Sequence, residues 1–87
     1  MAMPELSRFF GIVISIYRAD HPPPHIHAWH GNYEIAVRIA DGSITGAFPR
    51  HKQALVLEWC RLHKEELFEN WNLAQEHRPP KRIEPLE

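Results

Sequence analysis

Cysteine and long apolar runs are scarce in this chain, and each scarcity narrows the class of protein. The single cysteine, Cys60, excludes an internal disulfide and is typical of a cytoplasmic protein. The longest apolar run, residues 9–17, is interrupted by Gly11 and Ser15 and is too short to span a bilayer. No basic segment followed by an apolar one opens the chain, so we expect no signal peptide. The sequence therefore predicts a cytoplasmic protein with no membrane partner.

An excess of charge of either sign is also lacking. Ten Lys and Arg balance eleven Asp and Glu, which gives a net charge of −1. This balance excludes a strongly basic protein that binds nucleic acid without specificity, although it allows a local basic patch. The 87 residues are enough for one domain and not for two. Histidine and proline are plentiful instead, and residues 21–27 read His-Pro-Pro-Pro-His-Ile-His.

The distribution of turn residues divides this single domain, residues 1–87, into four zones. Residues 1–7 form a lead-in, and residues 8–48 are rich in Ile, Val and aromatic residues with short turn signals. Residues 49–77 contain no glycine and no proline after Pro49, which is typical of helix. Residues 78–87 contain three prolines and predict an extended tail.

Two turn signals set the register of a predicted four-stranded antiparallel meander (β-β-β-β). The Gly31-Asn32 turn pairs His30 with Tyr33, and so on down to His25 with Arg38. The Asp41-Gly42 turn predicts the pairs Ile39–Ile44, Val37–Gly46 and Ile35–Phe48. Both turns place the same apolar residues on one face, which a one-residue slip would invert. That face holds Ile26, Ala28, Ile35, Val37, Ile39, Ile44 and Phe48, joined by Ile12, Ile14 and Ile16 of the first strand.

A long C-terminal helix is expected to cover this apolar face. Apolar and small residues recur at spacings of three and four, with a bend or break expected near His63-Lys64. The stripe consists of Val56, Cys60, His63, Leu67, Trp71 and Ala74. The predicted fold is therefore a two-layer α+β domain, with a sheet covered on one face by one long or broken helix.

The opposite face of the predicted sheet carries the chemistry. It holds Ser15, Tyr17, His25, His27, Trp29, Glu34, Ala36, Arg38, Thr45 and Ala47. His25 and His27 point the same way because they are two residues apart on one strand, so their rings can converge on one ligand. His27 is expected beside the small residues Ala36 and Ala47, which leave room next to its ring.

Three functions fit this face. The first is a metal site in which His25 and His27 bind zinc or nickel, with Asp20, His21 or Glu34 as a further ligand. The second, which needs no cofactor, is phosphodiester chemistry on RNA. In that hypothesis, the catalytic residues are His25 and His27 as acid and base, Arg38 as phosphate clamp and Tyr17 as a stacking group. The third is an interaction surface for a second copy or another protein.

Two stretches of the chain resemble a known family. The first is Arg8-Phe9-Phe10-Gly11-Ile12, Tyr17, Asp20-His21, Pro23-Pro24-His25-Ile26-His27-Ala28 and Gly31. The second is Leu57-Glu58-Trp59, His63, Glu69-Asn70-Trp71, Ala74 and Ile83-Glu84-Pro85-Leu86. Together they resemble the small bacterial family called domain of unknown function 4160.

The resemblance implies a small cytoplasmic bacterial protein that works with a small protein encoded by a neighbouring gene, as in toxin–antitoxin modules. It implies no catalytic residues. Whether the chain is an enzyme is left open at this point, with an antitoxin-like binding module or a metal-binding domain as the alternatives.

Overall fold

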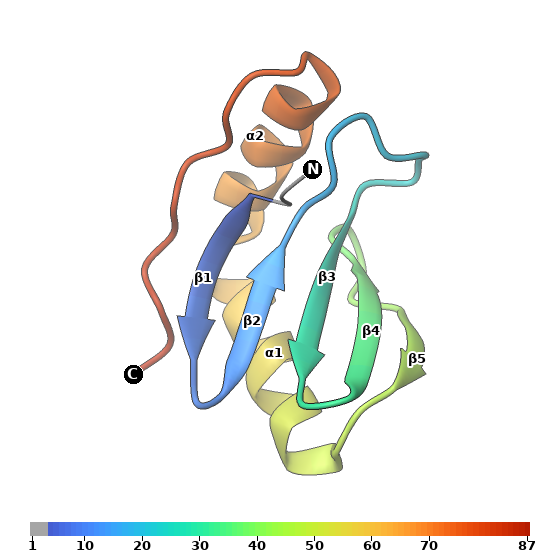
Figure 1. Cartoon of the computed structure of the whole chain (residues 1–87), viewed down its shortest axis with the longest axis vertical. Coiled ribbons are helices and arrows are strands. Elements are labelled where there is room, and N and C mark those ends of the chain that lie inside the picture. The colour runs from blue at the N-terminus through green and yellow to red at the C-terminus, as the bar shows by residue number, and fades with distance from the viewer. Residues whose placement is uncertain (1–3) are drawn as a thin grey trace.

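The computed structural model describes residues 4–87 and shows one antiparallel sheet backed by two helices (Figure 1). The elements are β1 (Glu5–Phe9), β2 (Ile12–Ser15), β3 (His25–His30), β4 (Tyr33–Arg38), β5 (Ile44–Ala47), α1 (Arg50–Leu62) and α2 (Lys64–Gln75). The strands lie in chain order, β1-β2-β3-β4-β5, and both helices cover the same face. The predicted α+β class is confirmed, but the prediction of four strands is wrong because there are five.

The additional strand is β1, part of which falls in the predicted lead-in. A two-residue turn at Phe10 and Gly11, both with positive φ, joins β1 to β2 and pairs Phe9 with Ile12. Phe-Gly is a weak turn signal because a bulky residue with positive φ is uncommon. Long-range bonds compensate: Lys52 Nζ donates to the Phe10 oxygen at 2.7 Å, and His30 Nδ1 donates to the Gly11 oxygen at 2.9 Å.

The predicted register is confirmed between β3 and β4 and wrong between β4 and β5. All six predicted β3–β4 pairs occur, and Ser15 pairs with His27 as expected. In β5, however, Ile44 pairs with Val37 instead of Ile39, and Gly46 pairs with Ile35 instead of Val37. The loop between β4 and β5 holds four residues, 39–42, instead of the predicted two: the Arg38 N–H donates to the Ser43 oxygen at 2.9 Å, and the Asp41 carboxylate accepts the Ser43 N–H at 2.9 Å. The shift of two residues in pairing keeps every side chain on its predicted face.

The helical layer breaks at His63, as the sequence indicated. His63 has φ −115° and ψ 26°, and its Nδ1 lies 2.6 Å from Glu66 Oε1 in the first turn of α2. The two helices can therefore cover different ends of the sheet, with α1 behind one end and α2 behind the other (Figure 1).

The single cysteine lies in the core, on the buried side of α1. Burial raises the pKa of the Cys60 thiol to about 12, which makes Cys60 an inert core residue.

The segment after α2 runs along the outside of β1 (Figure 1). The Ile83 N–H donates to the Leu6 oxygen at 2.8 Å, and Trp59 Nε1 donates to the Glu84 oxygen at 2.8 Å. Asn70 is buried and bonds both the N–H and the oxygen of Lys81 at 2.8 Å. These bonds cover the β1 edge of the sheet. Neither helix in residues 4–87 has the length and apolar character needed to cross a membrane.

Candidate functional site

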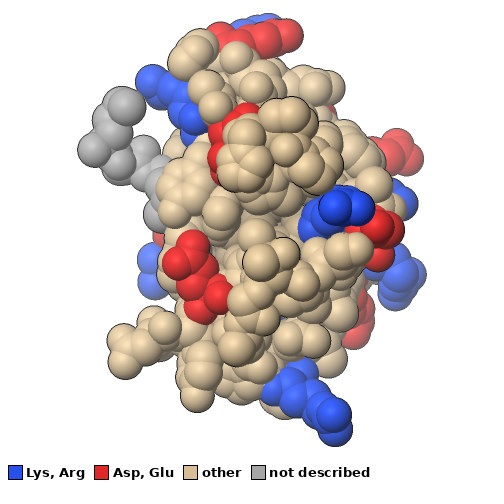
Figure 2. Space-filling view, turned by 90° about the vertical axis from the view of Figure 1, so that its right-hand side faces the viewer, with Lys and Arg blue, Asp and Glu red and all other residues tan. Residues whose placement is uncertain are grey.

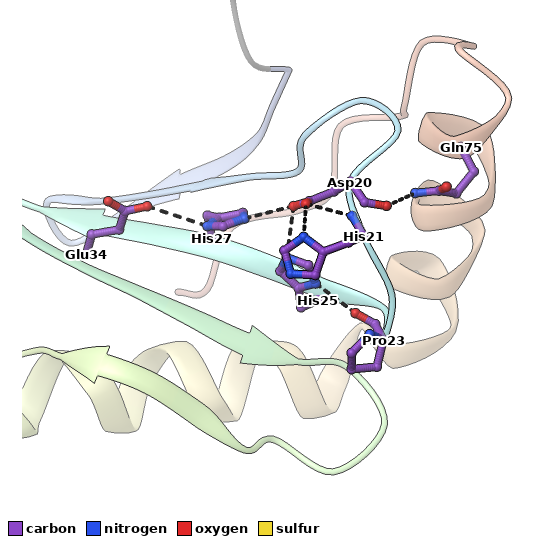
Figure 3. Close-up of polar contacts among 7 residues, drawn as sticks. All are labelled: Asp20, His21, Pro23, His25, His27, Glu34 and Gln75. Carbon is purple, nitrogen blue, oxygen red and sulfur yellow. Dashed lines mark hydrogen bonds and ion pairs between the residues drawn. The ribbon is translucent and has the colours of Figure 1, made fainter.

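The site lies at one end of the uncovered sheet face, where β3 begins and the loop from β2 arrives (Figure 3). His25 and His27 are on the face opposite Ile26 and Ala28, both of which are fully buried in the core. The loop of residues 16–24 folds back over this end and brings Asp20 between the two imidazoles. A carboxylate from the loop and two histidines from β3 thus meet at one point.

Asp20 is the centre of the cluster. Its Oδ2 lies 2.9 Å from His25 Nε2 and 3.2 Å from His27 Nε2. Its Oδ1 accepts the backbone N–H of His21 at 2.8 Å and lies 2.9 Å from His21 Nδ1. The three ligand atoms that Asp20, His25 and His27 offer all lie within 4.8 Å of one another. One carboxylate oxygen is therefore shared by two imidazole nitrogens.

The second nitrogen of each imidazole faces an acceptor on the far side of the ring. His25 Nδ1 lies 2.7 Å from the Pro23 oxygen, which can only accept, so His25 Nδ1 carries a proton. His27 Nδ1 faces Glu34 Oε2 at a longer distance of 3.5 Å, so the same tautomer would direct its N–H toward a carboxylate. With Nδ1 protonated, a neutral ring presents the Nε2 lone pair to the Asp20 carboxylate. Two acceptors 2.9 Å apart need a cation between them, either a proton or a metal ion.

Electrostatics keep Asp20 ionised. Burial raises the pKa of the Asp20 carboxyl, but when protons rather than a metal ion lie between Asp20 and the imidazoles, three effects outweigh it: the hydrogen bond from His27, the His21 backbone N–H and the charges of His25 and His21. The pKa of Asp20 therefore lies below its ordinary value. Burial and the charges of Glu34 and Asp20 raise the pKa of Tyr17, so its phenol stays neutral. Asp20 is therefore the anionic group of the cluster, and Tyr17 is not.

Aromatic side chains hold both histidines in place. The Tyr17 ring meets the His27 ring edge-on at a centroid distance of 4.2 Å, and Trp29 stacks on His27 at 5.8 Å. The Tyr17 and Trp29 rings also meet each other edge-on, at 6.4 Å. The His25 ring lies 5.3 Å from Trp71 of α2. His27 thus stands clear of the helices, whereas His25 contacts one. Tyr17, which the sequence assigned to stacking, thus packs against His27 together with Trp29.

A hollow of about 260 Å³ adjoins the cluster over β3, β4 and β5. His25, His27 and Arg38, which the sequence placed on one face, all line this hollow, whereas Tyr17 does not. Ala36 pairs with His27 on one side and with Thr45 on the other. The sequence predicted that Ala47 lies opposite Ala36. Because the pairing of β5 is shifted by two residues, Thr45 lies there instead and brings a hydroxyl group to this position.

The charge around this region is mixed. Figure 2 shows the molecule from the β5 side of Figure 1, with Lys and Arg side chains set apart from one another and acidic residues among them. Most of that surface carries no charge. A continuous basic groove, as expected for a long nucleic acid, is absent from the described residues on this face.

The sequence singled out Asp20, His21 and Glu34 equally as further ligands, and the structure distinguishes them. Only Asp20 joins the imidazoles on their Nε2 side, whereas Glu34 lies behind His27 and His21 bonds the other Asp20 oxygen. Gln75 was missed: its Nε2 donates to the Asp20 backbone oxygen at 2.8 Å. No local signal could have found it, because 55 residues separate the two.

Together, the fold and the site define a class: an α+β protein with a five-stranded meander whose uncovered face carries an Asp-His-His cluster. Residues 11–72 match the model of the family Domain of unknown function (DUF4160), so the chain belongs to that family. The matched segment contains the three residues of the cluster. No curated protein and no solved structure matches the chain.

Proposed function

We propose that this protein binds a divalent metal ion through Asp20, His25 and His27. One observation carries the proposal: both Nε2 atoms converge on a single Asp20 oxygen, while each Nδ1 faces an acceptor behind it. Metal-bound histidines usually donate their second ring N–H to a carbonyl or carboxylate, and Pro23 and Glu34 supply one of each. Protons between Asp20 and the imidazoles would also fit the distances. They would not, however, require an acceptor behind each Nδ1 atom, as the Pro23 oxygen and Glu34 provide.

Two of the three separations between ligand atoms suit zinc, and the third lies within 4.8 Å. With bonds of about 2.05 Å, neighbouring ligand atoms lie about 3.3 Å apart around a tetrahedral ion and about 2.9 Å apart around an octahedral one. The Asp20–His25 and Asp20–His27 separations of 2.9 and 3.2 Å match this range. Two imidazoles with one carboxylate are a ligand set for zinc, with nickel as the alternative.

Three protein ligands leave a coordination position free, which is typical of catalytic rather than structural zinc. The hollow beside His25 and His27 gives that position room for water or a substrate. A metal at this site would lower the pKa of a bound water and supply a nucleophile near neutral pH. We therefore favour metal-assisted hydrolysis as the activity.

A second candidate is metal-free acid–base chemistry on a phosphodiester. Arg38 favours it, because Arg38 pairs with His25 across the strands and lines the same hollow. The two imidazoles would then exchange protons with the substrate while Arg38 binds the phosphate. A short RNA end suits the mixed surface charge better than a long strand does.

The remaining expectations stay predictions. They are a bacterial, cytoplasmic protein, a toxin–antitoxin-like pairing with a small protein from a neighbouring gene, and a homodimer formed through the uncovered sheet face. Co-purification with the neighbouring gene product tests the pairing, and sedimentation of the purified chain tests the dimer. Either assembly would place the His25–His27 face against or beside its partner.

Metal titration of the untagged protein tests the main proposal. We expect Zn²⁺ to bind at one site by calorimetry, and Co²⁺ to give the visible absorption of a low-coordinate ion. Asp20→Asn and His27→Gln should each weaken binding by about 10- to 100-fold or more. His51→Gln, an equal change on an exposed helix residue, is the control. A folded protein that binds neither ion at concentrations well above micromolar would rule out the metal centre and leave the metal-free candidate.

A further inference from the structure

The side chains around Ala36 form a regular array across three strands. His25 pairs with Arg38, and the Arg38 N–H donates to the Ser43 oxygen at 2.9 Å, so His25, Arg38 and Ser43 form one row. His27, Ala36 and Thr45 form the next row. All of these residues except Ala36 carry polar side chains, and all line the hollow. Ala36 therefore forms a floor with polar groups around it.

The lining of this hollow is rich in donors. Arg38 offers a guanidinium group, Thr45 and Ser43 offer hydroxyls, and none of the described lining residues is acidic. The Arg38 side chain is half exposed, and its contact with Asp41 Oδ2 is long, at 3.4 Å. The Asp41 carboxylate already accepts the Ser43 N–H. Arg38 can therefore turn to a ligand in the hollow at little cost.

We propose that this hollow binds the phosphate group of a small phosphate ester, with Arg38 and Thr45 as the selective residues. The inference rests on the proposed metal centre: two of its three residues, His25 and His27, line the hollow, so a metal ion that they hold would lie beside it. The phosphate would accept bonds from the Arg38 fork on one side and the Thr45 hydroxyl on another, with one oxygen directed to the metal.

The directions of these donors favour a tetrahedral anion over a planar one. A carboxylate is satisfied in one plane by a guanidinium fork. Here the donors Arg38 and Thr45 lie on β4 and β5 beside the Ala36 floor, and His27 on β3 lies on the other side of Ala36 from Thr45. A tetrahedral group has oxygens to meet groups on both sides. The hollow, at about 260 Å³, also has room for an organic remainder larger than the phosphate itself.

The experiment uses the full chain loaded with Co²⁺, whose visible spectrum first establishes that the metal is bound. Phenyl phosphate is then titrated and followed by the cobalt spectrum and by backbone amide shifts in residues 36–45. We expect saturable binding that weakens about 10-fold or more in Arg38→Gln and about 3- to 10-fold in Thr45→Val. Thr45→Ser keeps the hydroxyl and is the matched control, so it should bind nearly as well as the parent.

Each outcome decides the inference. A protein that takes up Co²⁺ but binds no phenyl phosphate overturns the phosphate site and leaves the metal centre intact. Equal affinity for benzoate overturns the preference for a tetrahedral anion, and unchanged binding in folded Arg38→Gln overturns the assigned residues. A folded chain that takes up no Co²⁺ overturns the metal centre and this inference with it.

Discussion

The side chain of Gln75 donates a hydrogen bond of 2.8 Å to the backbone oxygen of Asp20, so α2 holds the loop that carries the central carboxylate (Figure 3). A second bond acts beside it, from the Ala19 N–H to the Ala74 oxygen at 3.1 Å. The C-terminal end of α2 thus positions a ligand that belongs to a loop between two strands. The Asp-His-His cluster and the helical layer are coupled by these contacts.

The first prediction follows from this coupling. Gln75→Glu replaces the donor by an acceptor that faces the Asp20 carbonyl, so the loop should lose its anchor. Zn²⁺ affinity should fall by about 10-fold, because a displaced Asp20 carboxylate no longer contacts both imidazoles. Calorimetric titration measures this loss. Gln53→Glu makes the same chemical change on α1 and should leave affinity within about 2-fold; equal effects of the two changes would contradict a positioning role for Gln75.

The second prediction separates the two histidines by stability. His25 is 8% exposed, bonds at both nitrogens and contacts Trp71. Its removal leaves the Pro23 oxygen without a partner, so His25→Ala should lower the free energy of unfolding by about 1–3 kcal/mol. His27→Ala should cost less, because its outer partner Glu34 is half exposed and can be solvated. Urea unfolding in the presence of EDTA measures the free energy of unfolding of both variants. An equal loss in His25→Ala and His27→Ala would show that the contacts of His25 with Trp71 and Pro23 add no stability beyond that of the His27 contacts.

The third prediction concerns acid. The pKa of Asp20 is lower in the folded protein than in the unfolded chain, so its contribution to stability is present above the unfolded pKa. That contribution should be lost as the pH falls through the folded pKa, from about pH 5 downward. The free energy of unfolding of the metal-free protein should therefore decline less steeply in Asp20→Asn than in the parent.

Asp41→Asn is the comparison for this acid series. The backbone N–H of Ser43 and, less strongly, the Arg38 charge lower the pKa of Asp41 as well, but its carboxylate is half exposed to solvent. Screening by water should make its share of the pH dependence smaller. If Asp20→Asn and the parent decline in parallel between pH 6 and pH 2, then the three histidines do not stabilise the Asp20 carboxylate.

Several features of this protein follow from the sequence because their causes are local. The Gly31-Asn32 turn and the alternation around it determine that His25, His27 and Arg38 share one face, since turn geometry sets the register of the strands it joins. The helical periodicity indicated the covered face and the break at His63. The family, too, follows from the sequence alone, from residues 11–72.

Other features depend on contacts between distant residues. The strand β1 needs Lys52 and His30 to hold its Phe-Gly turn. The shift of the β4–β5 pairing, which brings Thr45 beside Ala36, is the exception, because it accompanies a local bond from the Ser43 N–H to the Asp41 carboxylate. Asp20 reaches the two imidazoles because α2 anchors its loop through Ala74 and Gln75. Periodicity and turn chemistry describe neighbours along the chain, whereas a loop takes its position from the groups it meets across the fold. The sequence by itself determined which face carries the histidines, and the tertiary structure decided which carboxylate completes the cluster.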